Sequence, residues 1–467
     1  MTLTKPDLTT SLTGKWKSYP AYKDSGVEWL GEIPVHWGVR RLQFDCKINP
    51  KGDSLNLPGE MEVSFLPMEC IGEDGRLSLE KTRTIEQVRQ GYTYFQNEDV
   101  ILAKITPCFE NGKGALCQGL LNGIGFGTTE LHILRANEET YPKFIFYLTK
   151  SDPFQKIGAA MMYGAAGQKR LPEEFIRDFP VSTPTLLEQQ AIATFLDREI
   201  AKINTLIVKK ERLIELLQEK RAAIISQAVT KGLDPTVAMK NSGVEWLGEI
   251  PEHWETKRVR DVTELLQTGP FGSQLHSSDY TLNGIPVINP SHLRNGRIYP
   301  DWDCAVNEET RSRLVRHELQ EGDIIFARRG EMGRCALVTK IEKGWLCGTG
   351  SLLIRPRTSM VSPLYLNMVL STSGVKDWLL LESVGSTMNN LNTSILSRIP
   401  VPTPPLTEQN AITEYIDREM SKIDALISRI REGIEKLKEY STALISAAVT
   451  GKIDVRGEIA LLDDMDL

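Results

Sequence analysis

The stretch SGVEWLGEIPVHW at residues 25–37 returns as SGVEWLGEIPEHW at residues 242–254, with one difference, Val35 against Glu252. Two tryptophans, a proline and a histidine keep their register in both copies, which chance does not produce. We call these stretches box 1 and box 2. Because self-similarity at a fixed spacing is the signature of repeated structure, the two boxes predict a duplicated chain.

A longer repeat follows each box. Residues 179–234 align without a gap with residues 399–454, and about half of the aligned positions are identical. The order is therefore box, variable region and long conserved segment, and then the same three again. Each half spans about 220 residues.

The long conserved segments have the pattern of helices. Pro184 and the pair Pro404-Pro405 stand just before the periodic runs, where proline is tolerated. Apolar residues recur every seven positions on two complementary rows, which are Leu196, Ile203, Leu217 and Ile224 with Ile200, Ile207, Ile214 and Ala228, and in the second segment Ile416, Ile423, Ile430, Leu437 and Leu444 with Met420, Ile427, Ile434 and Ala448. This repeat indicates a coiled-coil seam.

Two such helices in one chain can pair with each other in antiparallel fashion. About 40 residues make a rod of roughly 60 Å, which would hold the two variable regions apart at a fixed distance. Lys210, Arg221 and Ser441 interrupt the seam. We expect the charged ones to extend along the seam and place their heads at its edge.

The variable regions, residues 38–178 and 255–398, have short β-rich runs separated by Gly, Asn and Asp turn signals. Several landmarks correspond, such as EDVILAKI at 98–105 with GDIIFARR at 322–329. The sequence thus predicts a mixed α/β (α+β) fold, in which two globular domains with twisted sheets are separated by two long antiparallel helices that form an intrachain coiled coil, as a tandem pseudo-twofold repeat.

Six consecutive segments follow from these patterns. They are an N-terminal extension at 1–20, a first globular domain at 21–185, a central helix at 186–232, a second globular domain at 233–403, a C-terminal helix at 404–454 and an acidic tail at 455–467.

Composition excludes some classes of protein. No stretch approaches about 18 uninterrupted apolar residues and the first residues lack the apolar middle of a signal peptide, so we expect a cytosolic protein without a membrane segment. The seven cysteines are scattered and never spaced C-x-x-C, which favours free thiols over disulfides or zinc. His36 and His253 belong to the boxes, where a structural hydrogen bond is expected rather than a metal.

The net charge of −6 decides little, because several acids gather near the C-terminal end. Catalytic motifs are also missing from the sequence. INPKG and INPSH lack the second proline and the aromatic residue of an amino-methyltransferase, and no phosphate loop, G-x-S-x-G elbow or H-E-x-x-H occurs. The pattern favours a binding protein with no catalytic or metal site of its own.

Candidate contacts to a polyanion such as nucleic acid lie in the variable regions. Guanidinium groups suit phosphates and guanine edges, and amides suit adenine. The candidates come from matching places in the two halves, and they are Lys104, Lys113, Gln168, Lys169 and Arg170 in the first and Arg328, Arg329, Arg334, Asn389 and Asn390 in the second. Each residue alone is more often a solvated surface group, and the correspondence between the halves raises the hypothesis.

The chain resembles the specificity subunits of Type I restriction-modification systems. The resemblance covers nearly all of it and rests on the two boxes and on TPTLLEQQAIATFLD and TPPLTEQNAITEYID in tandem, each followed by heptads. It implies a non-catalytic DNA reader with two target recognition domains, each reading one half of an interrupted asymmetric site on double-stranded DNA, with the helices as a ruler.

The same resemblance implies partners. Such subunits assemble with two modification subunits, which use S-adenosylmethionine to methylate adenine, and with restriction subunits, which use ATP and Mg²⁺ to translocate and cut. No cofactor is expected on this chain. Candidate docking positions near the helix starts, expected to be exposed, are Glu188, Gln189, Arg198, Glu408, Gln409 and Arg418, although capping and intrahelical pairing explain them about as well.

Two alternatives remain open at this point. One is a coiled-coil scaffold of tandem repeats with no DNA role, and the other is a self-sufficient restriction-methylation enzyme, which the missing motifs disfavour. Because box 1 and box 2 are nearly identical, they cannot distinguish two different half-sites. We expect Trp29, Trp37, Trp246 and Trp254 to be packing anchors, and recognition to come from the residues that differ.

Overall fold

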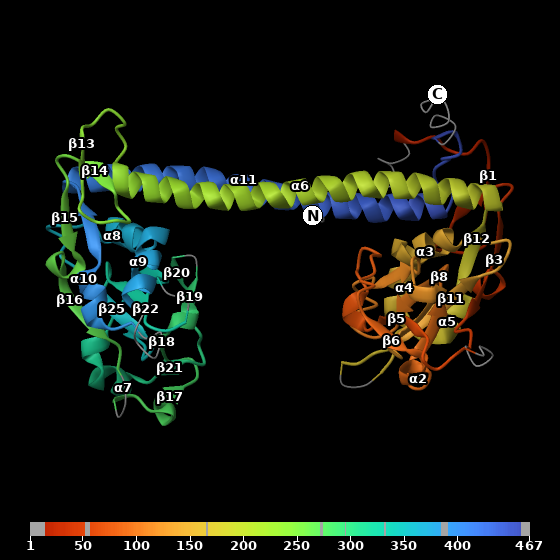
Figure 1. Ribbon diagram of the computed structural model, residues 1–467, viewed down its shortest axis with the longest axis horizontal. Helices are drawn as coiled ribbons and strands as arrows, with labels where there is room; N and C mark the ends of the chain where they lie inside the picture. Colours follow the sequence, from red (N-terminus) through yellow and green to blue (C-terminus); the bar gives the residue numbers. More distant parts are fainter. Residues whose placement is uncertain are drawn as a thin grey trace. The chain divides into compact units, whose positions relative to one another are not determined.

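A computed structural model describes residues 15–51, 57–164, 167–270, 274–294, 296–330, 333–383 and 391–458. Contacts divide the chain into two compact units (Figure 1). Unit 1 comprises residues 1–210 and 431–467, and unit 2 comprises residues 211–430. Each unit therefore takes one part of each long helix. The six segment boundaries predicted from the sequence stay a prediction.

The two long helices are α6 (Leu186–Lys231) and α11 (Leu406–Val449). In unit 1, the beginning of α6 and the end of α11 share one core, in which Ile192, Leu196, Leu444 and Ile445 are buried. Early residues of one helix therefore meet late residues of the other, which is antiparallel pairing.

Unit 2 repeats the antiparallel pairing with the remaining parts of the two helices. Arg221 Nη1 lies 2.9 Å from Asp424 Oδ1 and both side chains are partly exposed, so this seam arginine does reach the edge as expected. In unit 1, the other charged residue of the seam, Lys210, is half-buried and lies beside Gly433, where a side chain is missing.

Unit 1 is a mixed α/β domain. In the described part of the chain, its strands form two four-stranded sheets with the orders β6-β5-β10-β7 and β4-β11-β8-β9. The first sheet contains β5 (Glu62–Leu66), β6 (Thr82–Thr84), β7 (Thr93–Gln96) and β10 (Ile124–Gly127). The second contains β4 (Cys46–Ile48), β8 (Asp99–Ala103), β9 (Gly114–Leu116) and β11 (Leu131–Ala136). Every residue of β8 is buried, and β11 exposes little on either face, so these two strands are covered on both sides of the sheet.

Short elements connect the sheets of unit 1 to box 1 and α6. Box 1 contributes β2 (Glu32–Pro34), paired with β1 (Tyr22–Asp24), and β3 (Gly38–Arg41) pairs with β12 (Pro180–Thr183) just before α6. The helices are α2 (Ile85–Val88), α3 (Pro142–Lys150), α4 (Asp152–Met161) and α5 (Glu173–Asp178). Helix α3 contacts β8, β9 and β11.

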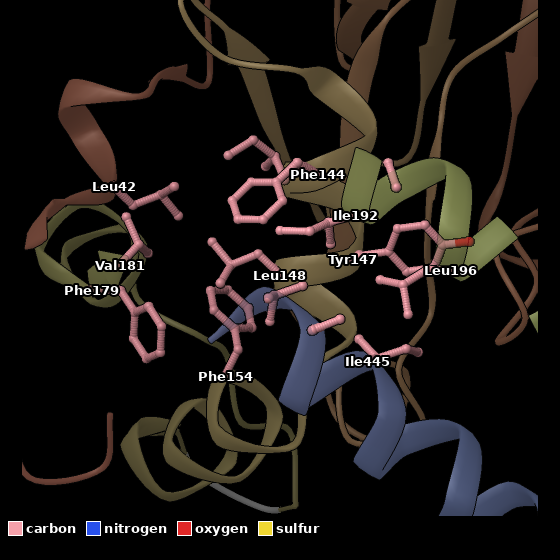
Figure 2. Packing of buried hydrophobic residues seen from close by; sticks show 14 of the residues in the cluster. Leu42, Phe144, Tyr147, Leu148, Phe154, Phe179, Val181, Ile192, Leu196 and Ile445 are labelled. Atoms are coloured by element: carbon pink, nitrogen blue, oxygen red, sulfur yellow. The ribbon is translucent and has the colours of Figure 1, made fainter. Parts of the chain in front are cut away.

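The main core of unit 1 joins these elements. Figure 2 shows Phe144 and Leu148 of α3, Phe154 of α4, Leu196 of α6 and Ile445 of α11 pointing toward one another. Each fully buried side chain of this size contributes about 1.5–3 kcal/mol relative to exposure. The globular part and the helix ends of unit 1 are therefore one folded body.

Unit 2 has the same plan. In the described residues its sheets have the orders β16-β25-β22-β23 and β17-β21-β18-β24. The first contains β16 (Thr263–Thr268), β22 (Ile324–Ala327), β23 (Cys335–Leu337) and β25 (Ser351–Pro356), and the second contains β17 (Tyr280–Thr281), β18 (Ile285–Ile288), β21 (Ala305–Val306) and β24 (Leu346–Cys347). The mixed α/β fold with two tandem sheet domains, each packed with parts of the two long helices, confirms the predicted fold class.

The remaining elements of unit 2 also have counterparts in unit 1. Strand β14 (Glu249–Pro251) of box 2 pairs with β13 (Met239–Asn241), and β15 (Glu255–Arg258) pairs with β26 (Pro400–Thr403). The helices are α7 (Glu308–Arg313), α8 (Pro363–Leu370), α9 (Ser373–Ser383) and α10 (Thr393–Arg398), and a separate hairpin is formed by β19 (Leu293–Arg294) and β20 (Arg297–Ile298). All seven cysteines of the chain are free.

Candidate nucleic-acid interface

The predicted DNA contacts of unit 1 gather where strand β8 ends. Lys104 follows β8 directly, and its backbone N–H donates to the carbonyl of Glu130 at 3.0 Å while its carbonyl accepts from the N–H of Leu171 at 2.7 Å. Ile105 pairs with Arg170 in an isolated bridge. Two segments that are far apart in the sequence, around 104 and around 168–170, therefore form one surface.

The side chains on this surface differ in how free they are. Arg170 binds Glu130 through two hydrogen bonds of 2.7 and 2.9 Å, which lower the pKa of the Glu130 carboxyl. Lys113 is half-buried and donates to the carbonyl of Met68 at 3.2 Å. Gln168 and Lys169 are exposed. Part of the predicted set thus shapes the loops, and Lys169 is a cation that the described structure leaves facing solvent.

Unit 2 builds the same backbone pattern with other side chains. Arg328 follows β22, its N–H donates to the carbonyl of Gly350 at 2.9 Å, and its carbonyl accepts from the N–H of Leu391 at 3.0 Å. Arg328 thus takes the place of Lys104. Arg329 is exposed and Arg334 is half-buried just before β23. Asn389 and Asn390 lie outside the described residues.

Sequence reasoning missed two exposed features of these surfaces. Tyr163 is 68% exposed and forms a backbone bridge with Arg170, so an aromatic ring lies on the unit 1 surface. In unit 2, Arg294 and Arg297 on the β19–β20 hairpin are exposed. The turn signal Asn295-Gly296 between Leu293 and Ile298 could have revealed the hairpin.

Glu188 was predicted to be exposed, but it is only 6% accessible. It lies in a joint between box 1 and the start of α6. Its Oε1 accepts from His36 Nε2 at 2.8 Å and Trp37 Nε1 at 3.3 Å, and its Oε2 accepts from Thr185 N and Oγ1. Burial raises the pKa of the Glu188 carboxyl, but these hydrogen bonds outweigh it and lower the pKa overall. His36 therefore makes the structural hydrogen bond that the sequence analysis expected.

The joint is repeated in unit 2. Glu408, 28% exposed at its side chain, accepts from His253 Nε2 at 2.9 Å and Trp254 Nε1 at 3.1 Å. Trp37 and Trp254 are fully buried, which confirms that these two are packing anchors. The boxes are nearly identical because each must place a histidine and a tryptophan against an equivalent glutamate carboxylate.

The neighbouring glutamines are buried as well. Gln189 Oε1 accepts from Tyr141 N at 2.8 Å, and Gln409 Oε1 accepts from Ser362 N at 2.7 Å, so each amide ties the start of a long helix to the start of α3 or α8. The prediction that Gln189 and Gln409 are exposed is wrong, because the backbone in front of these short helices needs a partner.

The two arginines of the predicted docking set lie in different environments. Arg198 binds Glu199 at 2.9 Å and the carbonyl of Glu458 at 3.2 Å, and its side chain is 25% exposed. Arg418 is 65% exposed, with its nearest carboxylate, that of Glu419, at 3.8 Å. Their role in docking stays a prediction.

Within the described residues, no group of three or more His, Cys, Asp or Glu side chains could hold a metal ion. The helices that the structure describes include none that is both long and apolar enough to cross a bilayer. Fold and site therefore define a class: a duplicated α/β chain that offers equivalent loops, with different side chains, at the same sheet edge of each unit.

Comparison with known proteins identifies the family. The family model for the Type I restriction modification DNA specificity domain matches residues 66–216 and 251–436. The chain belongs to this family, whose members are the non-catalytic specificity subunits of Type I restriction-modification systems.

Individual relatives agree with this assignment. The specificity subunit of the Type I restriction enzyme EcoEI from Escherichia coli is 24% identical over 517 aligned positions, which cover 93% of this chain and 86% of the relative. The HsdS subunit from Thermoanaerobacter tengcongensis has a similar fold, with a TM-score of 0.52 at 19% identity over 90% of this chain and 98% of that one. A chain from a study of the assembly and conformational transition of the type I R-M system gives a TM-score of 0.63 at 20% identity, over 90% and 99%.

Proposed function

We propose that this chain reads an interrupted, asymmetric sequence on double-stranded DNA, with each unit contacting one half-site. The observation that carries the proposal is the pair Lys104 and Arg328, whose backbones make equivalent hydrogen bonds in the two units while their side chains differ. A common scaffold with different side chains at the same edge is what two readers of different sequences need. Base edges in the major groove differ in their donors and acceptors, and side chains at these loops could read them.

The long helices supply the second part of the proposal. Each half-site is short, and one bidentate contact discriminates by only about 1–3 kcal/mol. Linking two readers makes the second contact effectively intramolecular and so multiplies their discrimination. We propose that the uninterrupted helices α6 and α11 set the spacer between the half-sites.

The partners of the complex complete the proposal. Chemistry would come from two modification subunits, which would use S-adenosylmethionine to methylate adenine in the bound site, and from restriction subunits, which would use ATP and Mg²⁺ to cut. Arg418, exposed near the start of α11, is the residue of the predicted docking set best placed to meet a partner. The chain itself would recruit these subunits to the sequence.

The test is a map of methylated adenines in a host that expresses this chain with its modification subunit. We expect one interrupted motif in which both halves are defined. The variant Lys169→Gln should relax or weaken only the half-site read by unit 1, and Arg329→Gln only the other, because each residue is exposed in a different unit. Methylation by the purified chain alone would contradict the non-catalytic role, and an absence of any salt-dependent DNA binding by the complex would favour a scaffold.

The ruler has its own test. Inserting one helical turn into α6 together with one into α11 should lengthen the spacer of the mapped motif and leave the bases of both half-sites unchanged. A matched insertion in the turn at Gly91, which is exposed in unit 1, should change neither. An unchanged spacer in the helix variant would refute the ruler.

A further inference from the structure

The β19–β20 hairpin of unit 2 carries two arginines that face each other. In its register Leu293 lies opposite Ile298 and Arg294 lies opposite Arg297. Leu293 and Ile298 are buried in a core cluster with Ala336, while both arginines are exposed, as the period of two along a strand requires. Like charges directly opposite across a strand pair are destabilising. The hairpin therefore holds a repulsive pair on its open face.

No ion pair relieves this repulsion within the described residues. Other arginines of unit 2 do have carboxylate partners: Arg313 lies 3.0 Å from Asp279 and Arg355 lies 2.7 Å from Asp323. Arg294 and Arg297 have no such neighbour in the part of the chain that the structure describes. Two unneutralised guanidiniums on one ribbon are suited to an anionic partner from outside the chain.

Unit 1 has a hairpin at the same place with the opposite charge. Ile71 bridges to Leu77, and the turn between them carries Glu73, Asp74 and Arg76. The guanidinium of Arg76 is bound to the Asp74 carboxylate. Each hairpin follows an equivalent one-turn helix, Met68–Cys70 in unit 1 and Pro290–His292 in unit 2. The scaffold is shared and the charge is not.

The unit 1 hairpin is also tied to its own core. Lys150 Nζ donates to the carbonyl of Glu73 at 2.8 Å and to that of Gly112, and burial lowers the pKa of this lysine to about 8. The aligned position in unit 2 is Ser371, the C-cap of α8, whose hydroxyl donates to the carbonyl of Met368 at 2.8 Å. A buried lysine thus ties the unit 1 hairpin to the core, and unit 2 has a serine at the corresponding position.

The basic hairpin lies beside the predicted DNA loops of unit 2. Strands β19 and β20 both contact β23, which begins directly after Arg334, and Figure 1 labels β19 and β20 next to β22. At its base, Pro290 lies against Gly350, whose carbonyl binds the N–H of Arg328. The hairpin therefore lies beside the end of β22 and the start of β23, where Arg328 and Arg334 stand.

We propose that the β19–β20 hairpin is a second DNA-contacting element of unit 2, in which Arg294 and Arg297 bind backbone phosphates of the half-site that this unit reads. A two-stranded ribbon fits the width of the major groove, so the two arginines on its open face can reach phosphates along it. The acidic hairpin of unit 1 has no such role, so the two units contact DNA differently. This inference rests on the proposed function.

The experiment compares salt dependence of binding for variants of the full chain assembled with its modification subunit. The probe is a duplex that contains the site mapped by adenine methylation, and affinity is followed by fluorescence anisotropy from about 50 to 200 mM salt. Each phosphate contact contributes about 0.9 to the slope of log affinity against log salt. The double variant R294Q/R297Q should therefore bind roughly tenfold or more weakly at low salt, with a slope shallower by about 1.8.

Matched variants separate the hairpin from general charge. R76Q removes an arginine from the unit 1 hairpin and should keep the wild-type slope, and R294K/R297K should keep the slope because lysine also binds phosphate as a point charge. All substituted side chains are exposed, and an unchanged unfolding midpoint checks that the double variant is folded. Wild-type affinity and slope in R294Q/R297Q would overturn the inference, whereas a wild-type complex without salt-dependent binding would instead overturn the proposed function.

Discussion

Each box also contacts a lysine at or just after the end of a long helix, and the two units differ in how the chain reaches this contact. In unit 2, Lys231 Nζ, at the end of α6, donates to the carbonyls of Leu247 and Glu249, which are 16 and 18 residues away. In unit 1, Lys452 Nζ donates to the carbonyls of Leu30 and Glu32, which are 422 and 420 residues away. The lysine and the box are thus joined by a short stretch of chain in unit 2, whereas in unit 1 the C-terminal segment must pack against a box that is distant in the sequence.

This difference shows that the C-terminal segment completes the core of unit 1. After α11, Ile453 and Val455 are fully buried in the core of unit 1, and the N–H of Asp454 donates to the carbonyl of Lys17 at 2.7 Å. Bringing distant segments together costs loop entropy that a short connection avoids. The stability of unit 1 should therefore depend on its C-terminal segment, whereas the stability of unit 2 should not.

Truncation after Val449 gives the largest expected effect. It removes Lys452, Ile453 and Val455, and burial of each apolar side chain contributes about 1.5–3 kcal/mol, so unit 1 should lose roughly 3–6 kcal/mol. Hydrogen exchange should show lost protection in the strands of unit 1, while those of unit 2 keep theirs. Truncation after Glu458, which retains these contacts, is the control. Equal loss of protection in both units would contradict the asymmetry.

The joint also shows what sequence can and cannot predict. The heptads, with Pro184 before them, predicted both long helices, since periodicity and proline act locally. The burial of Glu188 was missed, because a carboxylate in the first turn of a helix looks like an ordinary N-terminal residue. Its partners, His36 and Trp37, are about 150 residues earlier in the chain. The signal was present, because the box and the Leu-x-Glu-Gln motif are both repeated.

The positions of the candidate DNA contacts could be predicted only in part for a similar reason, and their role in binding DNA stays a prediction. Position after a β-rich run correctly brought Lys104 and Arg328 to equivalent places. Whether a cation is free cannot be read from spacing, and Arg170 is bound by Glu130, a residue 40 positions earlier. The basic hairpin was missed because two arginines three residues apart carry no charge signal of their own, and the turn signal Asn295-Gly296 between them was not used.

Replacing the carboxylates of Glu188 and Glu408 compares the stability that the joint contributes to each unit, and the expected effect is smaller. Glu188→Gln should destabilise unit 1 by about 1.5–3 kcal/mol, because a buried, charge-assisted set of hydrogen bonds is weakened. Glu408→Gln should cost unit 2 less, since that side chain is more exposed, at 28% against 8%. Chemical denaturation with probes in each unit measures both, and a larger loss in unit 2 would reverse the ranking.

The pH dependence of the same variant has a fixed sign. The folded state lowers the pKa of Glu188, so its contribution is fully present above the unfolded pKa of about 4.3 and is lost as pH falls through the folded value. The stability difference between wild type and Glu188→Gln should therefore be constant near neutral pH and shrink in acid. A difference that grows as the pH is lowered would show that another group is responsible.

The smallest expected effect concerns the helix seam of unit 1. Gly433 lies inside α11 beside Lys210, and a Cβ placed there would lie 3.3 Å from Lys210 Nζ, the mobile end of a long side chain. Since that end can shift and glycine weakens a helix by about 0.5–1 kcal/mol relative to alanine, Gly433→Ala should stabilise unit 1 by up to this amount. A raised denaturation midpoint in unit 1 alone would show that the glycine is not needed by the seam. A lowered one would mean that Lys210 is fixed where it lies, and that the two long helices pair less tolerantly in unit 1 than their repeated sequences imply.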